Sequence, residues 1–466
     1  MTSGLAATRI ARCLAAGALS HDRQSGGGGR QRPAFAALIR RRPPANLEGN
    51  YRSAEQPVLQ YHPRTLAATI HSVSAHFPVL LLTGPRQVGK TTLLEHCSGP
   101  ARRRVTLDDL DQRDLARRDP KLFLQRHPPP VLIDEVQYAP ELLSVIKMTV
   151  DSTQQPGQFW LTGSQKFRLM QGISESLAGR AAVLDLLGLS RAEIAGHAED
   201  ARPFLPTATW LSSARAGAEP LALPDVYRAI WRGSLPRAAL DPGMPLEVFF
   251  SSYLQSYVQR DVRALARVGD ELLFQRFVRA AAARTGQLLN YADLARDVDV
   301  DQKTTKHWLA ILEASGLVFL LPPWHSNLTK RLVKTPKLYF LDTGLCAYLT
   351  QWTSPESLEA GAMSGHILET YVVGEILKSW WHNGRRAPLH FYRDRDGREI
   401  DLIIEQDDHL YPVEIKRTAT PRRNATTAFD RLDGLGPERG AGAVICLCES
   451  DVPLSDDATA IPVGYL

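Results

Sequence analysis

An eight-residue stretch, residues 84–91, constrains the fold of this chain more than any other part of its sequence. It reads G-P-R-Q-V-G-K-T, which fits the pattern G-x-x-x-x-G-K-[S/T], and it follows an apolar run at residues 79–82. Helix-forming residues begin at Thr91. In this setting the glycines allow a tight loop whose backbone N–H groups point inward, and the following helix adds the positive end of its dipole. The sequence therefore predicts a strand, a phosphate-binding loop and a helix in direct succession.

The residues of this loop, together with an acidic pair further along, predict a nucleoside triphosphate site. Lys90 is expected to reach the β- and γ-phosphates, and the Thr91 hydroxyl to bind Mg²⁺. An apolar run at residues 131–133 ends in Asp134 and Glu135. Asp134 is expected to serve Mg²⁺, and Glu135 to orient and deprotonate an attacking water; a purely structural acidic pair is the alternative. The predicted nucleotide-binding residues are Gly84, Pro85, Arg86, Gln87, Val88, Gly89, Lys90, Thr91, Thr92, Asp134 and Ser164.

Short apolar runs alternate with helical patterns around this site. Besides the two runs already named, strands are predicted at residues 105–107 and 159–161, and a helix at residues 141–150. Strands that alternate with helices indicate an α/β fold, a parallel sheet with helices on both faces.

Two later positions are candidates for completing the reaction. The fourth apolar run is followed by small polar residues, where Ser164 or Gln165 is expected to sense the γ-phosphate. Arg180 is a candidate arginine finger that acts within the chain or across a subunit interface. The alternative for Arg180 is an exposed or ion-paired arginine without a catalytic role.

Several strings of this sequence resemble prokaryotic ATPases of the AAA type. In the first half these are LLLTGPRQVGKTTLL, VLIDEVQYAPELL, WLTGSQKFRLM and SLAGRAAVLDLLGLS. In the second half KLYFLDTGLCAYL, GHILETYVVGEILK and REIDLIIEQDDHLYPVEIKR resemble the same family. The resemblance covers about residues 75–466 and is loose across residues 201–245. It implies ATP and Mg²⁺ as cofactors, followed by a winged helix and a restriction-endonuclease-like domain of unknown function.

Residues 291–318 have the spacing of a helix-turn-helix. A short helix (291–297), a turn (298–301) and a second helix (302–315) are followed by a candidate wing around residues 329–340. The exposed side of the second helix would present a modest polar and basic set that contacts DNA, or the whole unit would act as a lid or interdomain clamp. This set is Gln302, Lys303, Lys306 and His307.

A second acidic cluster lies near the C-terminus. Two predicted strands, at residues 398–405 and 410–416, would bring Asp401 and Glu414 side by side. Such a pair is expected to bind Mg²⁺ or Mn²⁺, with Lys416 positioning or deprotonating a water; charge alternation on an exposed hairpin is the alternative. The resemblance to metal-dependent nucleases adds Glu369 as a further acid, with Glu375 as its alternate. The predicted metal residues are therefore Thr91, Asp134, Glu369, Asp401 and Glu414, and the predicted catalytic residues are Glu135, Arg180, Asp401, Glu414 and Lys416.

The expected domain order starts with a disordered tail rich in Arg, Gly and Pro at residues 1–57. An ATPase core (58–200), a helical linker or lid (201–265), a winged helix (266–350) and an α+β restriction-endonuclease-like domain (351–466) follow. The tail carries a net charge of +6, which leaves −1 for the rest of the chain, so any nucleic-acid contact must be a local basic patch. The tail also weakly resembles a transit peptide, and a misassigned start is equally consistent.

Composition excludes several classes of protein. No apolar run approaches the roughly 20 residues that cross a bilayer. Five cysteines are too few for a disulfide scaffold, and the pair Cys446 and Cys448 is interpreted as reduced core residues of a cytoplasmic protein. The sequence thus favours an ATPase that couples its nucleotide state to a module interacting with DNA or protein, with a homo-oligomer as one arrangement. The alternatives are an ATP-gated, metal-dependent DNA nuclease and a non-catalytic, ATP-dependent DNA-binding regulator.

Overall fold

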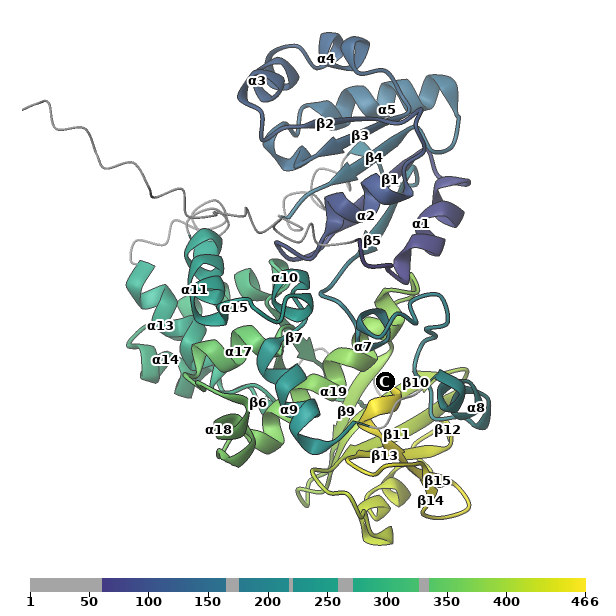
Figure 1. Cartoon of the computed structure of the whole chain (residues 1–466), viewed down its shortest axis with the longest axis vertical. Coiled ribbons are helices and arrows are strands. Elements are labelled where there is room, and N and C mark those ends of the chain that lie inside the picture. The colour runs from purple at the N-terminus through teal and green to yellow at the C-terminus, as the bar shows by residue number, and fades with distance from the viewer. Residues whose placement is uncertain (1–60, 165–175, 218–220, 259–270, 327–334) are drawn as a thin grey trace, which may run out of the picture. The chain divides into compact units, whose positions relative to one another are not determined.

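Five parallel strands form the sheet that carries the predicted phosphate loop. The computed structural model describes residues 61–164, 176–217, 221–258, 271–326 and 335–466. The strand order is β2-β3-β4-β1-β5, as Figure 1 shows. The strands are β1 (Val79–Thr83), β2 (Arg103–Thr106), β3 (Val131–Asp134), β4 (Phe159–Thr162) and β5 (Ala181–Asp185). The predicted α/β fold is confirmed for this part of the chain, and β5 is a strand that the sequence analysis did not identify.

The residues of β1 alternate between the two faces of this sheet, and each face is covered. Leu80 and Leu82 belong to one buried cluster, whereas Val79 and Leu81 belong to another. Successive side chains of a strand point to opposite faces, so a strand that is apolar throughout must be covered on both. The first cluster includes residues of α1 (Leu66–Ser74) and α2 (Lys90–Cys97), and the second includes residues of α3 (Leu110–Arg118), α4 (Pro120–Arg126) and α5 (Leu142–Thr153).

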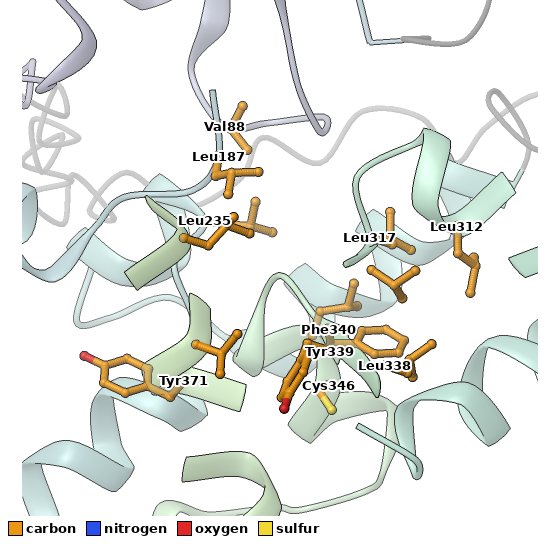
Figure 2. Packing of buried hydrophobic residues seen from close by; sticks show 14 of the residues in the cluster. Val88, Leu187, Leu235, Leu312, Leu317, Leu338, Tyr339, Phe340, Cys346 and Tyr371 are labelled. Atoms are coloured by element: carbon orange, nitrogen blue, oxygen red, sulfur yellow. The ribbon is translucent and has the colours of Figure 1, made fainter. Parts of the chain in front are cut away.

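The segment after the parallel sheet is helical, as the sequence predicts. Its helices are α7 (Arg191–Ile194), α8 (Ala208–Gly217), α9 (Leu223–Arg232), α10 (Pro236–Leu240), α11 (Leu246–Tyr257) and α13 (Glu271–Ala282). The apolar stripe of α11 is core, because Phe250, Tyr253 and Tyr257 are all buried. The same cluster contains Val88 of the phosphate loop and Phe340, and Figure 2 shows these two side chains within it. The phosphate loop therefore rests on a core that it shares with later parts of the chain.

The helix-turn-helix order predicted for the middle of the chain is present. The two helices are α14 (Tyr291–Val298) and α15 (Gln302–Ala314), and a three-stranded antiparallel sheet joins β6 (Gln287–Leu288), β8 (Lys337–Phe340) and β7 (Val318–Leu321) in that order. Part of the candidate wing, residues 327–334, lies outside the described residues. The four polar and basic residues expected on the free side of α15 are exposed. Its assignment as a winged helix remains a prediction.

A mixed sheet forms the C-terminal part. It contains β9 (Leu389–Arg393), β10 (Glu399–Gln406), β11 (His409–Ile415), β12 (Glu438–Arg439), β13 (Gly442–Cys446), β14 (Val452–Pro453) and β15 (Ala458–Pro462). Strands β9, β10 and β11 are antiparallel neighbours, whereas β11, β13 and β15 are parallel. Three helices precede the sheet, namely α17 (Thr343–Leu349), α18 (Pro355–Ala360) and α19 (Ser364–Trp381). Helix α19 contacts both β8 and β11, so it connects the middle sheet with the C-terminal one.

Three expectations from composition can be compared with the fold. The predicted tail, residues 1–57, lies outside the described residues. Within the part of the chain that the structure describes, no helix has the length and apolar character needed to cross a membrane. Cys446 and Cys448 are buried free cysteines whose sulfur atoms lie 3.2 Å apart, which agrees with their interpretation as core residues.

Candidate nucleotide site and carboxylate centre

The phosphate loop joins the end of β1 to the start of α2. Gly84 and Gly89 have φ angles of 141° and 90°, a region that other residues rarely adopt. A Cβ atom on Gly84 would also lie 2.0 Å from the carbonyl oxygen of Leu186. The Lys90 ammonium donates hydrogen bonds to the carbonyls of Gly84 (2.9 Å) and Pro85 (2.7 Å). The shape of the loop is thus held by its own lysine, which lies where a phosphate is expected to bind. The remaining predicted residues Arg86, Gln87, Val88 and Thr92 lie in this loop or in the first turn of α2.

Asp134 is the residue on which several side chains of this site converge. The Thr91 hydroxyl donates a hydrogen bond of 3.0 Å to Asp134 Oδ1, and the Thr162 hydroxyl donates to the same oxygen. Arg104, from β2, lies 3.3 Å from Asp134 Oδ2 and also pairs with Glu95 of α2. The structure therefore brings Thr91 and Asp134 together, as the sequence predicts. A hydroxyl and a carboxylate are hard oxygen ligands that fit Mg²⁺.

Thr162 and Arg104 were not predicted as site residues. Thr162 ends β4, whose neighbours in the sheet are β1 and β3. Its place at the end of an apolar run next to the phosphate loop is a signal that sequence reasoning could have used. Arg104 stands in a run of three arginines, Arg102 to Arg104, and nothing in that run distinguishes the one that meets Asp134.

Glu135 directly follows β3 and has a left-handed backbone with φ of 56°. The Gln137 side-chain amide donates a hydrogen bond to its carboxylate, which orients the group that the sequence predicts to be the general base. Ser164 lies just beyond β4, and its hydroxyl is buried without a hydrogen-bond partner among the described residues. A buried hydroxyl without a partner is available to an incoming polar ligand. Gln165, the alternative sensor, lies outside the described residues.

Arg180 lies at the opposite edge of the sheet from the phosphate loop. Its carbonyl oxygen accepts a hydrogen bond of 3.3 Å from the backbone of Val79, the first residue of β1. The five residues of β1 span roughly 16 Å at about 3.3 Å per residue, and the Arg180 guanidinium pairs with Asp151. This arrangement does not supply an arginine finger within the chain and matches the ion-paired alternative. A role across a subunit interface remains a prediction.

A buried network of ionisable side chains contacts the backbone of the phosphate loop. Arg64, which precedes α1, donates hydrogen bonds of 2.8 Å to the carbonyls of Val88 and Leu187. Its Nε lies 3.1 Å from Glu193 Oε2, and Glu193 Oε1 lies 3.2 Å from Nδ1 of His382. All three ionisable side chains are almost fully buried. Burial alone would raise the pKa of the Glu193 carboxyl, but its neighbours His382 and Arg64 hold that pKa well below its ordinary range.

This network, which sequence reasoning missed, joins the phosphate loop to the end of α19. His382 directly follows α19, and its Nε2 lies 3.3 Å from the backbone nitrogen of Leu187. A second contact reaches the loop from α15. A Cβ atom added to Gly316, just after that helix, would lie 2.8 Å from the ring of Pro85. Two later elements of the chain therefore bear directly on the loop.

The C-terminal hairpin brings its predicted acidic pair together. Leu402 of β10 pairs with Val413 of β11, so the same register sets Asp401 opposite Glu414. Asp401 Oδ2 accepts a hydrogen bond of 2.9 Å from the backbone of Ile415, and the Lys416 ammonium pairs with Glu414. Burial, with Asp401 beside it, raises the pKa of Glu414 to about 8.

Glu369, rather than its alternate Glu375, faces this pair. Burial and the charge of Asp401 raise the pKa of Glu369 to about 7. Glu375 instead pairs with Lys378 at 2.5 Å and accepts a hydrogen bond from the backbone of Arg191. The structure thus places Glu369 near Asp401, and Asp401 lies opposite Glu414. We call these three acids, together with Glu399 of β10, the carboxylate centre.

A lysine that the sequence analysis did not identify stands among these acids. The Lys337 ammonium, at the start of β8, lies 3.0 Å from Glu369 Oε1, 2.5 Å from Glu399 Oε1 and 3.9 Å from Asp401 Oδ1. Among the described residues, no three acidic, histidine or cysteine side chains form a group that could hold a metal ion. The residues of the carboxylate centre therefore do not fit the divalent ion predicted there.

Family comparisons agree with the order of these parts. Residues 76–195 match a family described as an AAA domain. Residues 223–356 and 364–466 match two families, each described as a domain of unknown function (DUF8612 and DUF4143). Over 425 residues the chain is 31% identical to the uncharacterized protein Rv2008c of Mycobacterium tuberculosis and to the uncharacterized protein Mb2031c of Mycobacterium bovis, covering 91% of this chain and 88% of each relative.

The chain belongs to the family of these two mycobacterial proteins. Its AAA domain, with the loop geometry above, makes it an ATPase of the P-loop type. The predicted boundaries of the individual domains remain predictions.

Solved structures give more distant likenesses. The Walker-type ATPase paby2304 of Pyrococcus abyssi is 16% identical, with a TM-score of 0.39 over 62% of this chain and 99% of that one. A RuvB variant of Thermotoga maritima is 15% identical, with a TM-score of 0.28 over 55% of this chain and 87% of that one. Neither likeness is close enough to assign a function.

Proposed function

We propose that this family member is a Mg²⁺-dependent ATPase that passes its nucleotide state to its C-terminal module. The observation that carries the proposal is the convergence on Asp134. Its carboxylate accepts hydrogen bonds from Thr91 of the phosphate loop and from Thr162 of β4, so two strand ends and the loop meet at one acid. Thr91 and Asp134 would hold Mg²⁺, which when bound neutralises phosphate charge.

Residues of this chain would bind the ATP phosphates and accept the proton of the attacking water. ATP phosphates bind the N–H groups of the loop and the start of α2. Lys90 exchanges the carbonyls of Gly84 and Pro85 for phosphate oxygens, because a charged acceptor makes the stronger hydrogen bond. Glu135, oriented by Gln137, accepts a proton from the water that attacks the γ-phosphorus, while the bond to the bridging oxygen breaks and leaves ADP.

Two contacts support transmission to the rest of the chain. Val88, in the loop, is held through its carbonyl by Arg64, which is paired with Glu193 and, beyond it, His382 at the end of α19. Pro85, in the same loop, abuts Gly316 at the end of α15. A loop that moves when it binds phosphate must shift one or both of these contacts, so α15 and α19 are the elements that would respond.

Two variants test the enzymatic part. Lys90→Ala should abolish ATP binding, because the ammonium that meets the phosphates is lost. Glu135→Gln should keep ATP binding and slow hydrolysis by about 10²-fold or more, the usual contribution of a general base. Calorimetry measures the binding and phosphate release measures the rate. Undiminished ATP binding by the Lys90→Ala protein, or full hydrolysis by Glu135→Gln, would contradict the proposal.

DNA is the partner that we favour for the C-terminal module. The observation behind this choice is the exposed side of α15, which carries Lys303 and Lys306 next to Gln302 and His307, and basic residues at a helix-turn-helix suit phosphate contacts. The same two variants test it. The Glu135→Gln protein with ATP should retain duplex DNA in a gel shift more strongly than the Lys90→Ala protein. Equal retention by both would argue against ATP-dependent DNA binding.

A further inference from the structure

Lys337 occupies the middle of the carboxylate centre. Its side chain is only 4% exposed, and its ammonium lies within 4 Å of three acids that come from two different elements, Glu369 of α19 and Glu399 and Asp401 of β10. Lys337 itself belongs to β8, in the three-stranded sheet with β6 and β7. The three positions around the ammonium are those from which oxygen ligands would hold a cation.

We propose that Lys337 is the built-in cation of the carboxylate centre and that it excludes a divalent metal ion from it. Mg²⁺ and Ca²⁺ require carboxylate oxygens at roughly 2.0–2.6 Å from the ion. An ammonium with three N–H donors satisfies the same oxygens at hydrogen-bond distance. Both cations cannot share this space, because their charges repel and the oxygens can face only one of them.

Other groups also engage oxygens of the centre. The Tyr339 hydroxyl donates at 2.6 Å to Glu369 Oε1, the oxygen that also faces Lys337. The backbone of Ile415 donates to Asp401 Oδ2, and Arg393 lies 3.4 Å from Glu399 Oε2. Lys416 pairs with Glu414. The second oxygen of Glu414 is buried without a hydrogen-bond partner among the described residues, but a carboxylate whose other oxygen pairs with Lys416 does not by itself make a metal site. The centre is therefore a lysine–carboxylate cluster that ties β8 to α19 and β10.

This inference does not depend on the proposed ATPase function. The sequence of Asp401, Glu414 and Lys416 resembles that of a metal-dependent nuclease and led us to expect a divalent ion at these residues. The proposal replaces that ion with the Lys337 ammonium. In this proposal the acids have a role without a metal, because their negative charges balance Lys337. Removal of the Lys337 charge should then leave the acids without their cation and create a divalent site.

The test measures Mn²⁺ binding by the nucleotide-free, full-length protein. Binding is followed by the electron paramagnetic resonance signal of free Mn²⁺ and by the thermal unfolding temperature. The wild-type protein and Asp401→Asn should bind Mn²⁺ alike. Lys337→Met should gain a Mn²⁺ site and a Mn²⁺-dependent rise in unfolding temperature, and the double variant Lys337→Met, Asp401→Asn should lose both. Lys337→Arg, which keeps the charge, should gain no site.

Two results would overturn the proposal. One is a Mn²⁺ site in the wild-type protein that Asp401→Asn removes, since the ion would then bind despite Lys337. The other is a folded Lys337→Met protein that gains no site, since something other than the ammonium would then exclude the ion. If Lys337→Met does not fold, Lys337→Gln takes its place, and the comparison of the wild-type protein with Asp401→Asn stands independently.

Discussion

At the scale of single residues, the carboxylate centre makes stability depend on pH. Burial and the neighbouring Asp401 raise the pKa of Glu414 to about 8, against about 4.3 in an unfolded chain. The folded protein therefore holds this proton more tightly than the unfolded one. The stabilising effect is present in full below the unfolded pKa and is lost as the pH rises through about 8.

The variant Glu414→Gln keeps the shape of the side chain and cannot ionise. Between about pH 5 and about pH 8 its free energy of unfolding should fall less than that of the wild-type protein, by an amount on the order of kilocalories per mole, since each pKa unit corresponds to about 1.4 kcal/mol. Urea denaturation at both pH values measures this. Glu449→Gln, at an exposed position, is the control and should leave the pH dependence unchanged. Parallel pH profiles for the wild-type protein and Glu414→Gln would refute the prediction.

At the scale of elements, a methyl group added just after α15 should displace the phosphate loop. Gly316 has φ of 72°, and an added Cβ would lie 2.8 Å from the ring of Pro85. Gly434 has a similar φ of 77°, but an added Cβ there would meet nothing within 4 Å. Both Gly→Ala changes should destabilise the protein by about 1 kcal/mol through backbone strain.

Only Gly316→Ala should also weaken ATP binding, measured by calorimetry, because only this change displaces the phosphate loop. Equal ATP affinity in the two variants would show that this contact does not bear on the loop.

The elements themselves were largely predictable because their signals are local. The apolar runs before the phosphate loop and before Asp134 predict β1 and β3, and glycine spacing predicts the loop between β1 and α2. The pairing of Asp401 with Glu414 was predictable too, because a short hairpin fixes its register within a few residues. Strand β5 was missed, since three of its five residues are alanine or aspartate, which are depleted in strands.

At the scale of the whole molecule, the partners that set the chemistry come from distant parts of the sequence. Arg64 meets the carbonyl of Leu187, 123 residues later, and the Lys337 ammonium meets Glu369, 32 residues later. The sequence contains no local pattern that predicts such pairs, because neither Arg64 nor Lys337 differs in its sequence surroundings from an ordinary charged residue. The predicted role of Arg180 within the chain and the predicted metal at Glu369 depend on such partners. The neighbours that bear on these predictions, Asp151 and Lys337, are fixed only by the tertiary fold.

ATP bound at the phosphate loop should alter the backbone of α19, because the network of Arg64, Glu193 and His382 joins the two. Hydrogen exchange of the backbone amides of α19, in the Glu135→Gln protein with and without ATP, measures this most directly. We expect ATP to change the exchange rates at the end of α19, where His382 meets Glu193, and to cause no change in the Lys90→Ala protein. ATP binding that alters exchange at the phosphate loop while α19 remains unaffected would contradict it.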